Sequence, residues 1–196
     1  MEHKYTKGYL EIVLGPMFSG KTSKLVEVYK QCRVCDIRVL VVNHADDVRY
    51  SQTTLDTHDQ AHIPCIHHKT LRSVIDDHMD LFTEATPLVV LINEGQFFED
   101  LYTGVHEMVN VHNAHVYVAG LDGDFKREKF GQMLDLIPLC DQVYKLKSLC
   151  MQCKDGTRAI FSHRIDQTNH AQKQVGTTES YVPLCRKCYQ MHLEAS

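Results

Sequence analysis

One eight-residue run, GPMFSGKT at positions 15–22, constrains the fold of this chain more than any other feature. It matches the pattern G-x-x-x-x-G-K-[S/T], and it lies between an apolar run at 9–14 and apolar residues with helical spacing at Leu25, Val26 and Tyr29. In this arrangement successive backbone N–H groups curl around phosphate oxygens, and the first turn of the helix adds its positive end. The alternative is an ordinary glycine-rich turn that caps a helix, and the flanking strand and helix patterns disfavour it.

The run therefore predicts a loop that binds the phosphates of a nucleotide. Lys21 would neutralise the β- and γ-phosphates, and Thr22 would hold Mg²⁺ through its hydroxyl group. The candidate phosphate-binding residues are Gly15, Pro16, Met17, Phe18, Ser19, Gly20, Lys21 and Thr22.

Buried strands are predicted at four apolar, β-branched runs, 9–14, 37–43, 88–92 and 116–119. Segments with helical spacing lie between them, which predicts βαβ units, a mainly parallel sheet and flanking helices. Ligands of such α/β folds sit beyond the carboxyl ends of the strands. We therefore expect the functional residues directly after each run.

Polar side chains follow the third run, in the order Asn93-Glu94-Gly95-Gln96-Phe97. This is the place of a metal-holding element, where aspartate usually occupies the position of Asn93 and a neutral amide is a weaker partner for Mg²⁺. Glu94 keeps its carboxylate and could accept the proton of an attacking hydroxyl group. The alternative for Glu94 is a solvated loop residue.

Two C-x-x-C pairs lie near the carboxyl end, at Cys150 with Cys153 and at Cys185 with Cys188. Four thiolates form the closed tetrahedral set of a structural zinc ion, which would stabilise a segment too short for a large core. The alternative is four unligated buried thiols. We expect a P-loop domain over 1–146 and a small ribbon-like zinc-binding subdomain over 147–196.

A third C-x-x-C, at Cys32 and Cys35, has no second pair of its own and lies where the helix after the loop should end. These cysteines are expected to pack as small hydrophobic residues. The thirteen histidines form no H-E-x-x-H or comparable ligand pattern and are expected at the surface.

Charge and hydropathy exclude several classes of function. The chain has 196 residues, a net charge of −4 and a pI of about 6.3, so it lacks the basic character expected of a nucleic-acid or anionic-membrane binder. It contains no apolar signal core and no run of about 20 apolar residues. We expect a soluble, cytoplasmic protein with no nucleic-acid or membrane partner.

The motifs together resemble the thymidine kinases of the cytosolic, zinc-containing type over nearly the whole chain. Their order and spacing carry the resemblance. The matching segments are GPMFSGKT at 15–22, D-x-R-Y-S at 47–51 with THD at 57–59, NEGQFF at 93–98, AGLDGDFKREKFG at 119–131, the two cysteine pairs, and QVG at 174–176 with Tyr181.

The resemblance implies transfer of the ATP γ-phosphate to the 5′-hydroxyl of thymidine, with Glu94 as the base and Asp47 and Arg49 near the phosphates. Phe125 would stack on the thymine, and the backbone near Val175 and Gly176 would read its edge. The other nucleoside contacts implied are Met17, Gln96, Phe97, Leu121, Ser162, Arg164 and Tyr181. The cofactors implied are ATP with Mg²⁺, held by Thr22 and Asn93, and a structural Zn²⁺; a lasso-like loop would cover the substrate, and the assembly would be a homotetramer.

Two departures from the family pattern matter. Asparagine stands at position 93, and the segment between the cysteine pairs is longer than usual, so that 165–173 is not assigned. Two other functions stay open. One is a nucleotide hydrolase that activates water; the NHAD segment at 43–46 only superficially resembles a guanine-reading element. The other is a zinc-ribbon module for nucleic acid, which the acidic charge disfavours.

Overall fold

A six-stranded parallel sheet forms the centre of the protein, in the strand order β5-β2-β6-β7-β1-β8. The computed structural model describes residues 7–47, 54–56, 62–84, 86–165 and 180–194. The strands are β1 (Tyr9–Leu14), β2 (Arg38–His44), β5 (Ile66–His68), β6 (Leu88–Ile92), β7 (His115–Gly120) and β8 (Gln142–Lys145). The predicted α/β class and mainly parallel sheet are confirmed.

The four runs predicted as buried strands correspond to β1, β2, β6 and β7, which are the inner strands of the sheet. The two edge strands, β5 and β8, were not predicted. Their side chains are half-buried or exposed, and they lack the continuous apolar pattern that a strand covered on both faces requires.

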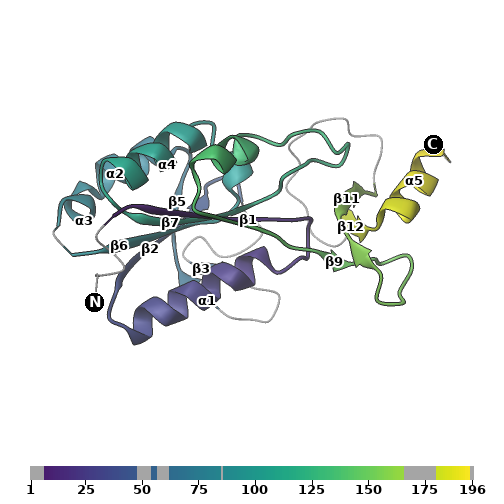
Figure 1. Cartoon of the computed structure of the whole chain (residues 1–196), viewed down its shortest axis with the longest axis horizontal. Coiled ribbons are helices and arrows are strands. Elements are labelled where there is room, and N and C mark those ends of the chain that lie inside the picture. The colour runs from purple at the N-terminus through teal and green to yellow at the C-terminus, as the bar shows by residue number, and fades with distance from the viewer. Residues whose placement is uncertain (1–6, 48–53, 57–61, 85, 166–179, 195–196) are drawn as a thin grey trace.

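Helices cover both faces of the sheet (Figure 1). Helix α1 (Lys21–Val34) packs on one face, while α2 (Leu71–Asp77), α3 (Met79–Thr83) and α4 (Leu101–Asn110) pack on the other. Each face has its own apolar core. Leu25 and Val26 of α1 are buried in one core, and Leu101, Val105 and Met108 of α4 in the other. Full burial of each such side chain is worth about 1.5–3 kcal/mol.

Short elements complete the sheet domain. A hairpin of β3 (Thr54–Asp56) and β4 (His62–Pro64) adds Leu55 and Ile63 to the core on the α1 face. Two 3-10 segments, η1 (Gly95–Phe97) and η2 (Met133–Leu139), follow β6 and β7. None of the described helices is long and apolar enough to cross a membrane.

The carboxyl-terminal part is a small unit beside the carboxyl edge of the sheet (Figure 1). It consists of the pair β9 (Ser148–Leu149) and β10 (Arg158–Ala159), the pair β11 (Phe161–Arg164) and β12 (Tyr181–Leu184), and helix α5 (Arg186–Glu194). A core of its own contains the four paired cysteines, Ala159, Leu184 and Tyr189. The expected lasso-like loop falls largely on 166–179, outside the described residues.

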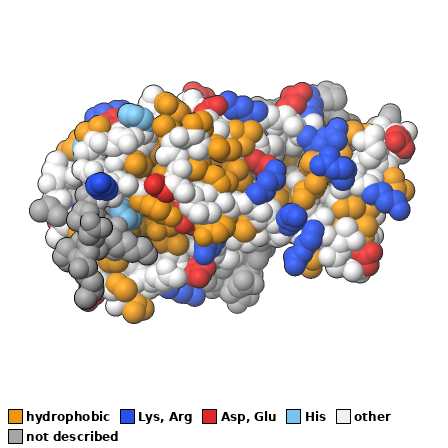
Figure 2. Space-filling model, in the orientation of Figure 1, with side chains coloured by type: hydrophobic (Ala, Val, Ile, Leu, Met, Phe, Trp, Pro, Cys, Tyr) orange, Lys and Arg blue, Asp and Glu red, His pale blue; other side chains and the backbone are white. Residues whose placement is uncertain are grey.

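Basic side chains gather on this small unit, on the face that Figure 2 shows. The chain as a whole has a net charge of −4. The exposed basic residues among the described ones are Lys147, Lys154, Arg158, Arg186 and Lys187, against the exposed acids Asp155 and Glu194. The carboxyl edge of the sheet therefore faces the more positive end of the molecule.

Parallel register brings the predicted motifs together. Leu14 lies opposite Gly120, and Ile92 lies opposite both Val42 and Val118, so β1, β2, β6 and β7 end at one edge. The segments that follow these strands contain the phosphate-binding motif, Asp47, Asn93 with Glu94, and Leu121.

Candidate active site

The loop after β1 adopts the conformation that its glycines permit. Gly20 has φ 86° and precedes the first residue of α1, which places the helix start directly at the loop. At Gly15, with φ 152°, an added Cβ would lie 2.8 Å from the carbonyl oxygen of Leu146. Ser148 Oγ donates a hydrogen bond to the carbonyl oxygen of Phe18 (3.0 Å), which ties the loop to β9.

Polar groups of this loop are arranged for an anionic ligand. Lys21 Nζ lies over the loop and donates to the carbonyl oxygen of Pro16 at 2.8 Å. The hydroxyl oxygen of Ser19 is buried and has no hydrogen-bond partner among the described residues. Because a buried hydroxyl group without a partner is costly, this site fits a ligand that brings acceptors of its own, as phosphate does.

Asn93 stands directly after β6 and meets the first turn of α1. The hydroxyl group of Thr22 donates to Asn93 Oδ1 at 3.4 Å, so two oxygen atoms suited to a hard cation lie side by side. Asn93 is almost fully buried and connects through Asn43 to Asp47. Asp47 therefore reaches the site indirectly, and Arg49 lies outside the described residues.

Glu94 occupies a left-handed backbone conformation, with φ 54° and ψ 42°, which turns the chain sharply after β6. Gln96 Nε2 donates to the Glu94 carboxylate, and Gln96 Oε1 accepts from the backbone N–H of Leu121 at 2.9 Å. Both ends of the buried Gln96 amide are thus used within the protein. Contact of Gln96 with a nucleoside stays a prediction.

Two of the predicted nucleoside-binding residues join the phosphate loop to the small unit. The backbone N–H of Met17 donates to Ser162 Oγ of β11 at 2.9 Å. Residues far apart in the sequence therefore lie together at the edge of the sheet.

Three further predicted residues form a second cluster. The guanidinium group of Arg164 donates to the hydroxyl oxygen of Tyr181 at 2.7 and 3.1 Å. Its Cζ atom lies 3.8 Å from the centroid of the Phe125 ring, a cation–π contact with a ring that the resemblance assigns to base stacking. Tyr189 donates its hydroxyl proton to the backbone carbonyl of Phe125. The sequence showed no signal for this anchoring role of Tyr189.

Phe97 does not lie with this cluster. It is buried, and its ring contacts His44, at 5.7 Å between centroids, and Phe130, at 5.7 Å in an edge-to-face arrangement. Its packing supports the loop after β6. Val175 and Gly176 lie outside the described residues.

A cavity of about 510 Å³ opens between the phosphate loop and the small unit. Of the predicted site residues, Phe18 and Tyr181 line it. The rest of its lining is Lys147, Ser148, Leu149, Met151, Arg158, Val182 and Pro183.

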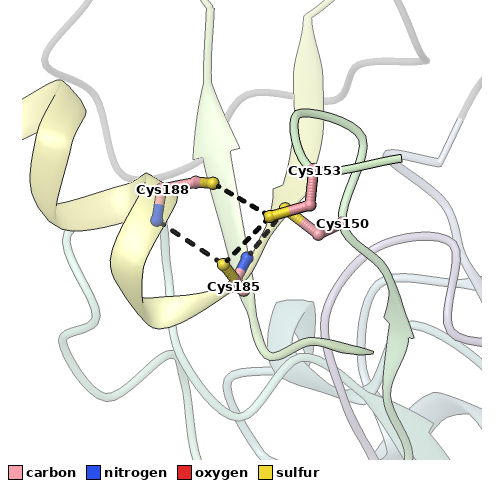
Figure 3. A group of neighbouring side chains, drawn as sticks. All are labelled: Cys150, Cys153, Cys185 and Cys188. Carbon is pink, nitrogen blue, oxygen red and sulfur yellow. Dashed lines mark hydrogen bonds between the residues drawn. The ribbon is translucent and has the colours of Figure 1, made fainter. Parts of the chain in front are cut away.

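The four paired cysteines converge, as Figure 3 shows. Their sulfur atoms all lie within 4.8 Å of one another, and the sulfur of Cys153 is 3.4 Å from that of Cys188 and 3.8 Å from that of Cys185. A tetrahedral zinc site with Zn–S bonds of about 2.3 Å requires sulfur separations of about 3.8 Å. The cluster therefore fits a zinc ion.

Backbone N–H groups point at these sulfur atoms. Cys185 donates to the sulfur of Cys150 at 3.3 Å, and Cys188 donates to the sulfur of Cys185 at 3.5 Å. Burial alone would raise the pKa of the Cys150 thiol, but hydrogen bonds from the backbone of Cys153, Cys185 and Gln152 outweigh burial and lower that pKa to about 6. Such bonds stabilise a thiolate, the form that binds metal.

The third cysteine pair lies apart, at the end of α1. Cys32 is buried, and burial raises the pKa of its thiol, while Cys35 is exposed. Neither belongs to a group of potential metal ligands among the described residues, and the described histidines form no such group either. Several histidines are buried, including His44, His115 and His163, so their expected surface position was wrong for these three.

One polar residue of the site was not identified from the sequence. Asn43 is the second-last residue of β2. It is only 1% exposed, and its side chain bonds to both Asn93 and Asp47. Its place at the carboxyl end of an inner strand was the available signal.

A phosphate-type loop, adjacent oxygen ligands and a carboxylate, all at the carboxyl edge of a parallel sheet, define a P-loop nucleotide-binding enzyme. A sequence model described as thymidine kinase matches residues 8–189. The chain therefore belongs to the thymidine kinase family.

Curated relatives come from viruses, bacteria and animals. Thymidine kinase of sheeppox virus is 36% identical over 93% of this chain and 97% of its own length. Thymidine kinase of Bacteroides thetaiotaomicron is 37% identical over 93% of this chain and 87% of its own length. Human cytosolic thymidine kinase is 34% identical over 94% of this chain and 74% of its own length.

Proposed function

We propose that this protein transfers the γ-phosphate of ATP to the 5′-hydroxyl group of thymidine, which yields dTMP and ADP. The observation that carries the proposal is the carboxylate of Glu94, which accepts a hydrogen bond from Gln96, whose own side-chain oxygen accepts from the backbone N–H of Leu121. Glu94 directly follows Asn93, which contacts Thr22 of the phosphate loop. Family membership supplies the substrate class.

In the proposed step, the 5′-oxygen of thymidine forms a bond to the γ-phosphorus as the bond from that phosphorus to the β,γ-bridging oxygen breaks. The proton of the 5′-hydroxyl group passes to the Glu94 carboxylate, and ADP leaves with the bridging oxygen. Lys21 and the backbone N–H groups of 15–22 stabilise negative charge on the phosphates. Positioning and charge stabilisation supply most of the catalysis in phosphoryl transfer.

Thr22 and Asn93 would hold Mg²⁺ through their adjacent oxygen atoms. When bound, Mg²⁺ would supply positive charge that offsets the negative charge of the phosphates. Asp47 and Arg49 would act near the phosphates.

The nucleoside would lie against the small unit. Phe125 would stack on the thymine. Arg164, which bonds to Tyr181, would fix the position of the Phe125 ring. Met17, Leu121 and Ser162 would surround the 5-methyl group. The backbone of Val175 and Gly176 would read the edge of the base, and Tyr181 would help to close the pocket. Gln96 and Phe97 would line the site.

Zinc bound by the two cysteine pairs would stabilise the fold of the subdomain that we propose for 147–196. This subdomain follows the nucleotide-binding domain that we propose for 1–146. We further propose that the protein acts in the cytoplasm as a homotetramer.

The decisive experiment supplies the purified protein with ATP, Mg²⁺ and each of the four deoxynucleosides. Formation of dTMP matched by ADP, and dependent on thymidine, is the expected result. ADP without a nucleoside monophosphate would indicate hydrolysis instead. Phosphorylation of another deoxynucleoside in preference to thymidine would contradict the proposed specificity.

Loss of the zinc site should destabilise the protein. We expect the variant Cys153→Ser to lose bound zinc and to lower the Tm by on the order of 5–10 °C, because losing about 2–3 kcal/mol shifts the Tm of a chain this size by about 2–4 °C per kcal/mol. Elemental analysis and calorimetry measure the two effects. The matched control is Cys35→Ser, an exposed cysteine outside the cluster. Equal zinc content in both variants would refute the assignment.

A further inference from the structure

A chain of buried hydrogen bonds connects the phosphate loop to a carboxylate behind it. Thr22 Oγ1 donates to Asn93 Oδ1 (3.4 Å), Asn93 Nδ2 donates to Asn43 Oδ1 (3.0 Å), and Asn43 Nδ2 donates to Asp47 Oδ2 (3.1 Å). The side chains of Asn43, Asn93 and Asp47 are all at most 3% exposed. Their neighbours, rather than water, therefore set the orientation of both amides.

The direction of this chain is fixed from the Asp47 end. An ionised carboxylate can only accept hydrogen bonds, so Asn43 must turn its Nδ2 toward Asp47 and its Oδ1 toward Asn93. Asn43 Nδ2 also lies 3.3 Å from His67 Nε2, a ring nitrogen that can accept its second N–H. Asn93 must then donate through Nδ2, and only its Oδ1 remains to face Thr22.

The orientation of the Asn93 amide decides whether position 93 can bind a cation. An aspartate presents an oxygen atom whichever way its carboxylate turns, whereas an asparagine rotated by 180° would present an NH₂ group, which has no lone pair for a metal. Asparagine at the metal-holding position therefore requires a partner that controls its rotation.

We infer that Asn43 is a positioning residue for the metal–nucleotide site. Because Asp47 can only accept hydrogen bonds, it fixes the orientation of the Asn43 amide. Asn43 in turn fixes the orientation of Asn93, so that Asn93 presents its oxygen to the metal. The inference rests on the proposed binding of Mg²⁺ and ATP by this loop. It does not depend on which nucleoside accepts the phosphate.

The variant Asn43→Leu tests the inference, because leucine has a similar branched shape and no hydrogen-bonding group. The probe is Mn²⁺ together with the non-hydrolysable analogue β,γ-imido-ATP, and the readout is the dissociation constant of Mn²⁺ from the complex, measured by electron paramagnetic resonance. We expect this constant to rise by about tenfold or more, as when other partners that orient metal ligands are removed. The matched control is Asn110→Leu, on the exposed surface of α4.

A second substitution separates orientation from packing. In the double variant Asn43→Leu with Asn93→Asp, position 93 presents oxygen in either rotation, so Mn²⁺ affinity should return to within about threefold of the wild type. A structural role of Asn43 alone would not be corrected by this change. Failure of the double variant to recover affinity would overturn the inference, as would an Asn43→Leu variant that binds Mn²⁺ like the wild type.

If Asn43→Leu does not fold, Asn43→Ala takes its place, alone and together with Asn93→Asp. Mn²⁺ affinity should again fall in the single variant and recover in the double variant, and a single variant that binds Mn²⁺ like the wild type would contradict the inference. The wild type is assayed in parallel for thymidine phosphorylation. Wild-type binding of Mn²⁺ without thymidine turnover would reject the proposed function and leave the role of Asn43 to be decided by the Mn²⁺ data.

Discussion

Replacing Glu94 by glutamine should lower the kcat for thymidine phosphorylation by about 10²- to 10⁴-fold, the range that a positioned general base contributes. Glutamine has nearly the same shape and can still contact Gln96, but it cannot take the proton from the 5′-hydroxyl group. Steady-state kinetics with saturating ATP would measure kcat and the KM for thymidine separately. Because the lost interaction belongs to the transition state, kcat should fall far more than the KM changes.

The matched control is Glu99→Gln, an exposed glutamate of the same loop. It removes the same charge a few residues away and should leave kcat within about twofold of the wild type, since surface substitutions rarely perturb a distant site. If Glu94→Gln and Glu99→Gln turned over thymidine equally fast, Glu94 would have no role as a base. Another group of the site would then have to receive the proton.

The inner part of the fold could be predicted because it repeats simple patterns. Strands buried on both faces require continuous apolar runs, and those runs marked β1, β2, β6 and β7. The loop at 15–22 and the residues after β6 follow from the rule that ligands meet the carboxyl ends of parallel strands. The spacing of the cysteine pairs predicted their convergence for a similar reason, since two C-x-x-C turns supply one tetrahedral set.

The remaining features depend on which side chain meets which, and spacing does not determine that. The amide of Gln96 bonds to Glu94 on one side and to Leu121 on the other, a partnership that exists only once β6 and β7 are paired. Asn43 meets Asn93 for the same reason, because β2 and β6 are neighbours in the sheet although about fifty residues separate them in the sequence. The sequence located these residues near the site without revealing their hydrogen-bond partners.

The surroundings of Phe97 could not be predicted either. Its place beside Gln96 in a family motif suggested a residue that lines the site, and the structure adds that its ring packs against His44 and Phe130. A short 3-10 segment turns successive side chains by about 120°, so neighbours in the motif point in different directions. Adjacent residues of one motif can thus have different partners within the protein.

Replacing Lys21 by methionine should reduce kcat/KM for ATP by about 10²- to 10³-fold, comparable to the loss of one preorganised charge-stabilising group in other enzymes. Methionine keeps an unbranched stem but removes the ammonium group, which in this structure lies over the loop against the carbonyl oxygen of Pro16. Since the β- and γ-phosphates are charged before the reaction and gain charge as the bond breaks, both the KM for ATP and kcat should suffer.

Two control variants make the Lys21 prediction specific. Lys24→Met removes the same charge within the first turns of α1, where Lys24 pairs with the half-exposed Glu27 and lies over the ring of Tyr144. An exposed ion pair of this kind is worth at most about 1 kcal/mol. Its kcat/KM should therefore stay close to that of the wild type. Lys21→Arg retains the charge, but a guanidinium group is planar and larger than a compact ammonium group, so we expect little recovery. If Lys21→Met and Lys24→Met showed equal kinetics for ATP, the loop at 15–22 could not be the phosphate-binding element. The proposed orientation of ATP would then be wrong as well.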